Sequence, residues 1–581
     1  MDRPDRVLER VGVPLAAVVT LGLLVVMFFY PVGTVLVESV RVDGRFSLDV
    51  FRSVLTSEFY FGTFAAALSD PGVLVGAFPD YRLGLFGFTV WQALLSTLAS
   101  VVLGLPGAWV LARFEFPGRR TVRSLTALPF VMPTIMVAIG FLATFGREGI
   151  LNQALRALGL PTLELLGTIH IIVLAHAFYD APLIARITAA AWEGVDAGMP
   201  ETARSLGASP VRAFRDVTLP QLLPAILTGA LLTFIFSFMS FAIVLALGGL
   251  QKATIEVWVF HSVEQLEYGT AAGLAVLETV FSLALTYAYL QYEARQRTAS
   301  AARPPERTPL FGGLSVDRAA AFAYGAVAVV VFVLPMASMV LASVTGPDGF
   351  TLRNYAFLVE RQAEAYSFQV RPLTAVRNSL VFGVGTLLLA VPMGVLLAVV
   401  STRGFRGRKL VDTVAMAPFA VSGVVVGLGL LRGLVFGVEA VGYRFTVSGA
   451  LAIVAAHAVG AYPFVTRTVA PALAGIDSSM LESARSLGAS RTRVLFDVEL
   501  PVVVPGILAG MAFAFALSIG EFDSTVILAT GGSEYTMPVA MERFRGRRLG
   551  PATAMGCVLL AVTAVSFVFI DRLGEGRGLN G

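Results

Sequence analysis

Few of the side chains that normally perform chemistry occur in this sequence, and their spacing matches no catalytic or metal-binding pattern. There is one cysteine, Cys557, and the four histidines are scattered, which excludes a cysteine or zinc cluster. No Gly-x-x-x-x-Gly-Lys-Ser/Thr phosphate loop occurs, because neither Lys252 nor Lys409 follows the required glycine pattern. Nucleophile–base pairs and paired catalytic carboxylates are also absent from the sequence. We therefore predict no catalytic residue, no metal site and no cofactor in this chain.

The polar residues that stand out lie within long apolar stretches, where an ionisable group is costly and marks a functional candidate. Asp180 is the first, and the alternative for it is a carboxyl group paired inside the protein. Glu521 and Asp523 could attract a cationic solute or form a charged pair at the membrane surface. We predict a solute path that includes Asp180, Ser237, Ser240, Ser518, Glu521 and Asp523.

Two further groups have simpler explanations than solute binding. His176 and His457 are equivalent in a sequence repeat, and hydrogen bonds between packed helices explain them better than a ligand or proton-relay role. Four phenylalanines between positions 234 and 241 could stack on an aromatic cation, but a stripe facing lipid or core is the favoured interpretation.

Composition defines the class of protein. The 581 residues are 56% hydrophobic and 14% charged, with a mean hydropathy of +0.78. Soluble domains carry nearer ~25% charged residues. The apolar residues form long runs such as 14–31 and 381–400, and about 20 such residues cross a bilayer core. The chain is therefore predicted to be a polytopic membrane protein, which excludes a soluble enzyme and a disordered chain.

Hydropathy predicts an all-α membrane protein with about twelve transmembrane helices. The first apolar segment reaches about Val37, is too long for a signal-peptide core, and is predicted to be a retained span. The other spans are predicted near residues 88–112, 124–146, 167–191, 220–246, 270–292, 318–343, 376–400, 411–435, 447–472, 501–530 and 552–572.

Arginine placement sets the predicted orientation, because cytoplasmic loops carry the excess of positive charge. The loops after the second, fourth, sixth, eighth and tenth spans are rich in arginine, which puts both termini in the cytoplasm of a multi-pass cell-membrane protein. One loop departs from this pattern, because Arg543, Arg545, Arg547 and Arg548 fall on the outside. This basic loop is a candidate for contact with an external partner.

The chain consists of two related halves. A segment rich in proline, glycine and charge predicts a first half at 1–292, a cytoplasmic linker at 293–316 and a second half at 317–581. Residues 201–220 and 482–501 align without a gap, 281 positions apart, and are identical at 13 of 20 positions. The halves are therefore parallel repeats. Because the strongest similarity lies in a loop and not in a span, the pattern favours a docking element.

Each copy of this loop predicts a helix, a turn and a second short helix. Gly207 and Gly488 suit the left-handed position that ends a helix. Ser209 and Ser490 are placed to cap the helix that follows, and a Leu-Pro pair then opens the next span. A short helix along the cytoplasmic surface could press on a soluble partner, and a plain connector is the alternative.

At these residues the sequence resembles the integral-membrane subunit of an ATP-binding-cassette importer. The signature of that family is Glu-Ala-Ala, three residues, Gly, nine residues, Ile, one residue and Leu-Pro, and it occurs here twice with mild changes. The resemblance implies that both loops couple the permease to an ATPase. The coupling residues would be Glu201, Ala203, Gly207, Asp216, Leu219 and Pro220 in the first loop, and Glu482, Ala484, Gly488, Asp497, Leu500 and Pro501 in the second.

The resemblance further implies a fused permease with two cytoplasmic ATP-binding subunits, which would hold ATP and magnesium, and an external binding protein that delivers the solute. The net charge of +4 is small for this length and argues against nucleic acid as a partner. The segments 518–523 and 535–538 look slightly more like thiamine permeases than ferric-iron permeases, and phosphonates are a third option. A twelve-helix secondary transporter without an ATPase partner is the alternative function.

Overall fold

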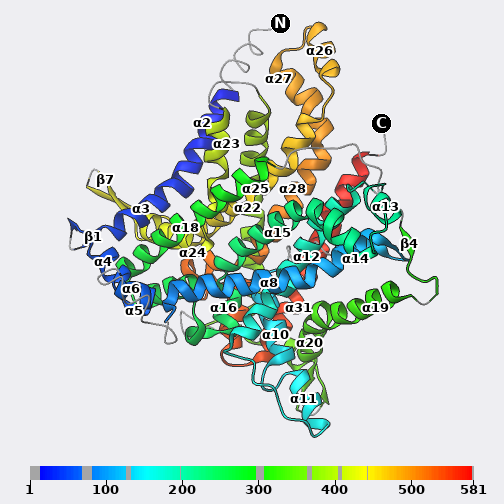
Figure 1. The fold of residues 1–581 in the computed structure, drawn as a ribbon. Helices are drawn as coiled ribbons and strands as arrows, with labels where there is room; N and C mark the ends of the chain where they lie inside the picture. Colours follow the sequence, from blue (N-terminus) through cyan, green and yellow to red (C-terminus); the bar gives the residue numbers. More distant parts are fainter. Residues whose placement is uncertain are drawn as a thin grey trace. The chain divides into compact units, whose positions relative to one another are not determined.

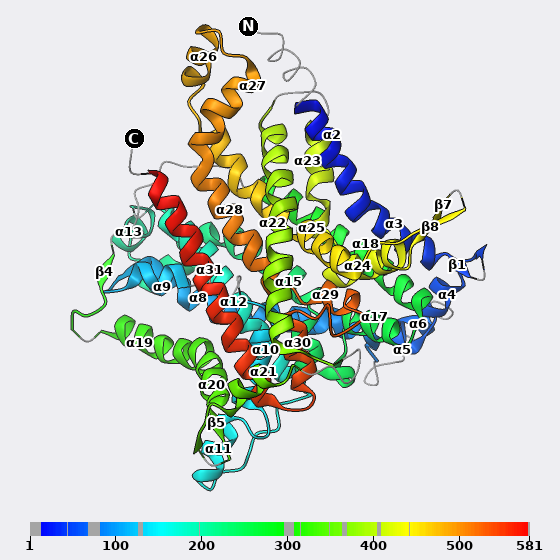
Figure 2. The same cartoon turned by 180° about the vertical axis from the view of Figure 1, so that it is seen from behind.

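The computed structural model describes residues 13–42, 44–67, 82–125, 132–196, 198–295, 307–313, 315–347, 349–362, 369–403, 408–440 and 442–578. These residues are helical almost throughout, with four short two-stranded pairs, which confirms the all-α prediction. Contacts divide the chain into two compact units (Figures 1 and 2). Unit one consists of Met1–Leu48, Ser262–Thr279 and Phe350–Gly581, and unit two of Asp49–His261 and Val280–Gly349.

The elements follow one another along the chain as two comparable series. The first series is α2 (Val13–Leu24), η2 (Val25–Phe29), α3 (Tyr30–Ser39), β1 (Arg41–Val42), β2 (Arg45–Phe46), α4 (Asp49–Leu55), α5 (Glu58–Phe61), α6 (Thr63–Ala67), α8 (Gly84–Arg113), β3 (Phe114–Glu115), α9 (Arg119–Leu125), α10 (Thr134–Phe145), α11 (Ile150–Ala157), α12 (Ile169–Glu193), α13 (Gly198–Ser205), α14 (Pro210–Ala213), η3 (Phe214–Thr218), α15 (Leu219–Phe238), α16 (Ala242–Leu247), η4 (Gly249–Lys252), α17 (Ile255–Glu264) and α18 (Tyr268–Arg295). The second series is β4 (Thr308–Pro309), α19 (Val316–Ala328), η5 (Val329–Val333), α20 (Leu334–Ser343), β5 (Thr345–Gly346), β6 (Gly349–Phe350), α21 (Arg353–Glu360), α22 (Pro372–Thr402), α23 (Arg408–Met416), η6 (Ala417–Ala420), α24 (Gly423–Leu430), η7 (Leu431–Val435), β7 (Val438–Ala440), β8 (Tyr443–Phe445), α25 (Gly449–Ala474), α26 (Ser478–Ser486), α27 (Arg491–Val494), η8 (Leu495–Glu499), α28 (Leu500–Gly520), α29 (Asp523–Leu528), α30 (Met537–Arg545) and α31 (Leu549–Gly578).

Within the described residues, eleven helices are long and apolar enough to cross a membrane, and one bent pair would make twelve. The eleven are Val18–Ser39, Gly84–Arg113, Thr134–Ala157, Ile169–Glu193, Pro210–Phe238, Tyr268–Tyr292, Val316–Ser343, Pro372–Thr402, Gly449–Ala474, Arg491–Gly520 and Leu549–Ser566. The number agrees with the prediction of about twelve spans.

The predicted spans at 411–435 and 220–246 are wrong as continuous helices. The first bends by 99° between α23–η6 and α24. There the Ser422 hydroxyl accepts a hydrogen bond from the Val425 backbone N–H. This cap starts α24 as a new helix after η6 has ended. The second is broken after Phe238, and the chain resumes as α16. Hydropathy averaged along the chain does not detect such local capping.

The predicted span at 501–530 is broken as well, between α28 and α29. The Glu521 carboxylate accepts hydrogen bonds from the backbone N–H groups of Ser524, at 2.8 Å, and Thr525, at 3.2 Å. A side chain that satisfies the first N–H groups of a helix allows that helix to begin within an apolar stretch. The predicted span at 124–146 also differs, because α10 begins only at Thr134; residues 126–131 lie outside the described part.

The first helix of each predicted half packs in the unit that is built mainly from the other half. In unit one, α3 contacts α24 and η7: the Tyr30 hydroxyl donates to the Gly433 carbonyl oxygen at 3.2 Å, and Arg432 lies 2.8 Å from the Glu38 carboxylate. In unit two, α20 packs against α10. The boundaries 1–292, 293–316 and 317–581 stay a prediction about the sequence repeat; linker residues 296–306 and 314 lie outside the described residues.

Helix α31 connects the two ends of unit one (Figure 2). The start of α2 and the loop formed by α26 and α27 lie toward the end where α31 finishes. The helices α21 and α30 lie toward the opposite end, where α31 begins. The duplicated loop and the basic loop at Arg543–Arg548 therefore belong to opposite ends of this unit.

Close helix packing depends on glycines at equivalent positions of the two repeats. In unit one, a Cβ atom on Gly394 of α22 would lie 2.5 Å from the Val465 Cβ atom of α25, and one on Gly510 of α28 would lie 3.2 Å from the Val465 Cα atom. In unit two, a Cβ atom on Gly104 of α8 would lie 2.7 Å from the Ala181 carbonyl oxygen of α12. Small residues at these positions let membrane helices approach one another closely.

We expect Gly394→Val to lower the free energy of unfolding by about 1–3 kcal/mol, because the added methyl groups overpack the contact with Val465. Gly460→Val is the matched control, since Gly460 lies on α25 with no atom within 4 Å of its Cβ position. Thermal unfolding of the detergent-purified chain measures both variants. Equal midpoints for the two variants would contradict the packing argument.

Candidate functional site

The duplicated loop forms the same local structure in both copies. In unit two α13 is followed by a turn and α14, and in unit one α26 is followed by a turn and α27, as predicted. The prediction of a separate second helix is wrong, however. Both α14 and α27 continue through one π-helical turn, η3 or η8, directly into the long helices α15 and α28. A π-helical turn inside an α-helix is frequent at functional sites.

The turn explains why the signature contains glycine and alanine at fixed positions. The φ angles of Gly207 and Gly488 are +94° and +88°, the left-handed conformation that favours glycine. The Ala203 carbonyl oxygen accepts a hydrogen bond from Ala208 N–H at 3.0 Å, and Ala484 accepts the equivalent bond at 3.1 Å. These bonds span five residues and close a Schellman-type helix end in both loops.

Side-chain caps complete the same architecture. The Ser209 hydroxyl accepts a hydrogen bond from Arg212 N–H at 3.3 Å, and the Ser490 hydroxyl accepts one from Arg493 N–H at 3.2 Å, as predicted. Asp477 caps the start of α26, and the hydrogen bond from the Ser479 backbone lowers the pKa of its carboxyl group. These helix starts in the two loops are therefore each capped by a side-chain hydrogen bond.

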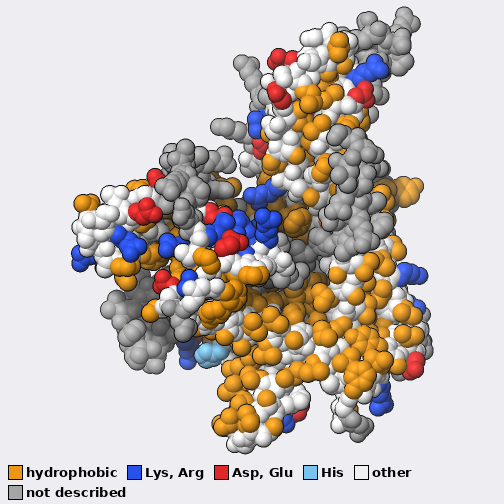
Figure 3. Space-filling model, turned by 90° about the vertical axis from the view of Figure 1, so that its right-hand side faces the viewer, with side chains coloured by type: hydrophobic (Ala, Val, Ile, Leu, Met, Phe, Trp, Pro, Cys, Tyr) orange, Lys and Arg blue, Asp and Glu red, His pale blue; other side chains and the backbone are white. Residues whose placement is uncertain are grey.

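The acidic signature residues differ in their surroundings. Glu201 and Glu482 are exposed, and no described residue forms an ion pair with their carboxylates. Asp216 pairs with Arg215 at 2.6 Å, and Asp497 pairs with Arg493 at 3.4 Å. The Leu-Pro pairs of the signature begin α15 and α28. At the top of Figure 3, charged side chains lie around hydrophobic ones on the α26–α27 loop.

Large apolar side chains on the turns are unusually exposed. The exposed fractions of Leu206 and Leu487, which precede the two glycines, are 85% and 90%. Met199 and Met480, at equivalent positions in the two loops, are half-exposed. A singly exposed apolar side chain is normal on a protein surface, so the leucines are candidates because they recur beside the glycine in both loops. Both leucines were missed as candidates, although they are identical within the repeat and adjacent to its glycines.

The predicted path residues of unit two form two hydrogen-bonded groups, Ser240 with His176 and Ser237 with Asp180. Its Nδ1 atom lies 2.9 Å from the Ser96 hydroxyl, and its Nε2 atom lies 2.8 Å from the Ser240 hydroxyl. The Ser237 hydroxyl donates to Asp180 Oδ2 at 3.1 Å. Asp180 is 1% exposed, and its Oδ1 atom has no hydrogen-bond partner among the described residues. One carboxylate oxygen is therefore left for another ligand or for a proton.

Two of the three predicted path residues of unit one, Ser518 and Glu521, contact His457. Its Nδ1 atom lies 2.8 Å from the Ser518 hydroxyl, and its Nε2 atom lies 2.8 Å from the Thr525 hydroxyl and 3.0 Å from the Glu521 carboxylate. Asp523, the third, is the first residue of α29. Whether either cluster contacts a solute stays a prediction.

The histidines connect packed helices, as the sequence interpretation expected. Of the four phenylalanines, Phe238 and Phe241 are buried, whereas Phe236 is exposed. Ser96, Thr386 and Thr525 were missed as members of the polar clusters; Thr386 and Ser518 share a hydrogen bond of 3.0 Å. Ser96 and Thr386 stand 290 positions apart, not 281, as do Gly104 and Gly394. This slip in the repeat register hides their equivalence.

Within the described residues the chain has eleven or twelve candidate membrane spans, two related halves and two exposed loops, an architecture suited to the membrane component of a transporter. The chain belongs to the family of binding-protein-dependent transport system inner membrane components, whose sequence profile matches residues 100–343 and again residues 390–577. It is therefore a multi-pass inner-membrane protein and a permease component of an ATP-binding-cassette importer. Members of this family transport solutes and are not enzymes.

Individual relatives cover most of the chain. The thiamine transport system permease protein ThiP of Brucella abortus is 28% identical over 522 residues, which are 86% of this chain and 89% of that protein. ThiP of Escherichia coli is 28% identical over 504 residues, with 85% and 89% covered. A bacterial ABC transporter involved in the import of alginate matches in structure with 20% identity and a TM-score of 0.39, over 45% of this chain and 95% of that one.

Proposed function

We propose that this chain is the fused permease subunit of an ATP-driven importer of thiamine. The observation that carries this proposal is the similarity to two thiamine permeases along 85–86% of the chain. The same observation favours thiamine over ferric iron. Thiamine is an organic cation, and the carboxylates of the buried Asp180 and the partly buried Glu521 are suited to attract one along the path.

Two cytoplasmic ATP-binding subunits are the proposed partners of the duplicated loops, one subunit for each loop. The exposed leucines Leu206 and Leu487 would enter apolar grooves on these subunits, and the signature residues would hold the turn in shape. ATP and magnesium would be bound by the partner subunits. Because each short helix continues through a π-helical turn into a long helix, a push on the loop would move α15 or α28 as a rod.

An external binding protein is the proposed partner at the opposite end of unit one. Arg547 and Arg548 are exposed, and neither has a carboxylate partner among the described residues. The Arg548 guanidinium lies 5.9 Å from the ring centre of Phe357, and Arg361 lies 5.2 Å from the same ring. Four arginines in a short external loop oppose the usual charge bias, and an acidic docking surface on the binding protein would compensate for them.

Uptake of labelled thiamine and labelled ferric iron, measured in cells with and without this gene, tests the proposed solute. We expect thiamine uptake to be lost without the gene and to disappear when ATP is depleted, while iron uptake is unchanged. Loss of iron uptake alone would overturn the choice of thiamine. Thiamine uptake that persists after ATP depletion would overturn the ATP-driven mechanism.

We expect Gly207→Val and Gly488→Val to weaken ATPase binding roughly tenfold, because a left-handed turn strains a side chain by about 1–2 kcal/mol. No atom lies within 4 Å of either Cβ position, so the effect would come from the backbone alone. Gly207→Asn is the control, because asparagine tolerates this conformation. Binding of the purified ATPase to the reconstituted permease is the measurement. Equal affinity of the valine and asparagine variants would contradict the role of the turn.

We expect the double variant Arg547→Glu/Arg548→Glu to slow association with the binding protein roughly tenfold at low salt, and much less at high salt. The double variant Arg45→Glu/Arg444→Glu makes the same charge change on two other exposed arginines of unit one. Surface plasmon resonance on the nanodisc-embedded transporter gives both rates. The same loss in both double variants would show that net charge, and not this surface, controls docking.

A further inference from the structure

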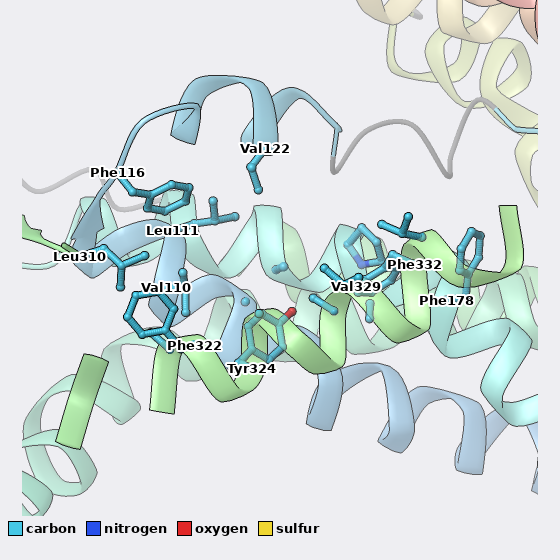
Figure 4. Close-up of a pocket in the computed structure, with 18 of the residues that line it drawn as sticks. Val110, Leu111, Phe116, Val122, Phe178, Leu310, Phe322, Tyr324, Val329 and Phe332 are labelled. Carbon is cyan, nitrogen blue, oxygen red and sulfur yellow. The ribbon is translucent and has the colours of Figure 1, made fainter. Parts of the chain in front are cut away.

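Unit two contains an apolar cavity of about 490 Å³ between α8, α12 and the continuous helix α19–η5–α20 (Figure 4). Phe116 and Leu310 lie at one end of the cavity, and Phe178 and Phe332 lie at the other. The Tyr324 hydroxyl is the only polar side-chain group among the described residues that line it. The walls are otherwise built from apolar side chains and glycine.

The cavity lies among helices whose surroundings are hydrocarbon. All three lining helices are candidate membrane spans: Gly84–Arg113, Ile169–Glu193 and Val316–Ser343. The cavity is open on one side, because its lining residues Phe322, Val329 and Val333 are about half exposed, and an apolar space of this kind does not hold ordered water. The volume is within the range of ligand sites, about 300–1,000 Å³. A hydrocarbon chain is the occupant that these conditions favour.

Positive charge gathers near the end of the cavity formed by Phe116 and Leu310. The strands β3 and β4 hold these two residues together, with Leu310 N–H donating to the Glu115 carbonyl oxygen at 2.9 Å. Arg119 follows Phe116 by three residues, and Arg307 precedes Leu310 by three. Three arginines contact the single carboxylate of Glu193, and they are Arg119 at 2.8 Å, Arg123 at 3.0 Å and Arg307 at 3.0 Å.

A fourth arginine adds to this excess of charge. Within the described residues, the Arg318 guanidinium donates only to backbone carbonyl groups, those of Pro309, Gly312 and Gly313. Arg307 also lies 3.6 Å from the Glu115 carboxylate, so that among the described residues these four guanidinium groups lie beside two carboxylates, those of Glu115 and Glu193. Basic sites between membrane spans on the cytoplasmic side are typical binding sites for anionic lipid headgroups.

We propose that this cavity is a phospholipid site, in which one acyl chain lies between α8, α12 and α19–η5–α20 and an anionic headgroup lies at the arginines beside Glu193. The lipid would fill the space between the helices of the first repeat and the first helix of the second. It would contribute apolar contact area that the protein alone does not supply. The site is independent of the solute that the transporter carries.

A single glycine allows the cavity to be filled without a clash. Gly325 lines the cavity on α19, and no atom lies within 4 Å of its Cβ position, so Gly325→Leu places a side chain in the cavity. Gly22 of α2 provides the matched control, because it lies on the first helix of the other half and its Cβ position is equally free. Gly22→Leu therefore makes the same change outside the cavity.

Native mass spectrometry tests the site on the complete chain. The purified permease is reconstituted in nanodiscs of equal parts palmitoyl-oleoyl phosphatidylglycerol and phosphatidylcholine, then transferred to mild detergent before the bound lipids are counted. We expect the wild type and Gly22→Leu to retain one phosphatidylglycerol more than Gly325→Leu. Circular dichroism confirms that the compared variants are folded. The same lipid count for both leucine variants would overturn the acyl-chain assignment.

A second variant tests the headgroup separately. Arg123→Gln removes one of the three positively charged guanidinium groups that contact Glu193, and Arg123 is not among the residues that line the cavity. We expect it to lower the preference for phosphatidylglycerol over phosphatidylcholine about fivefold, the effect of one basic residue at a membrane surface. Equal retention of the two lipids by the wild type, or an unchanged preference in the variant, would overturn the assignment of an anionic headgroup.

Discussion

Hydrocarbon supplies no hydrogen bonds, so a membrane chain must satisfy its polar groups from within. The breaks in the predicted spans follow this constraint. Where α28 stops, the Glu521 carboxylate takes up the first N–H groups of α29, and His457 contacts the same carboxylate. Where the chain bends by 99°, Ser422 does the same for α24. Irregular backbone within these apolar stretches is therefore held by specific side chains.

The two repeats keep the scaffold and differ in their polar groups. The glycine contacts around α12 recur around α25, and a histidine bridges hydroxyl groups in both halves. Asp180 exists only in the first half, where the second has Ala461, and Glu521 occupies the position that corresponds to Ser240. The repeated contacts thus explain how the helices pack, whereas Asp180 and Glu521 each belong to one half alone.

The sequence predicted the features that depend on local pattern. The number of spans follows from the apolar runs. The turn at Gly207 follows from the glycine itself, because glycine is the residue that best adopts a left-handed backbone conformation at a helix end. The helix breaks were not predicted, because a hydropathy average cannot weigh one capping carboxylate. The partners Ser96 and Thr386 and the apolar cavity were not predicted either, because they depend on contacts between helices distant in sequence.

The first helix of each half packs in the unit built mainly from the other half, and this arrangement has a consequence for biosynthesis. The hydrogen bond between Tyr30 and Gly433 joins residues 403 positions apart. The first helix therefore leaves the ribosome long before its packing partners α24 and η7 are synthesised. Until then it lies in the bilayer without these contacts. Such long-range contacts slow assembly and prolong the lifetime of incomplete intermediates. Joining both halves in one polypeptide keeps the waiting helix tethered to its own partner, so that it does not pair with a neighbouring copy.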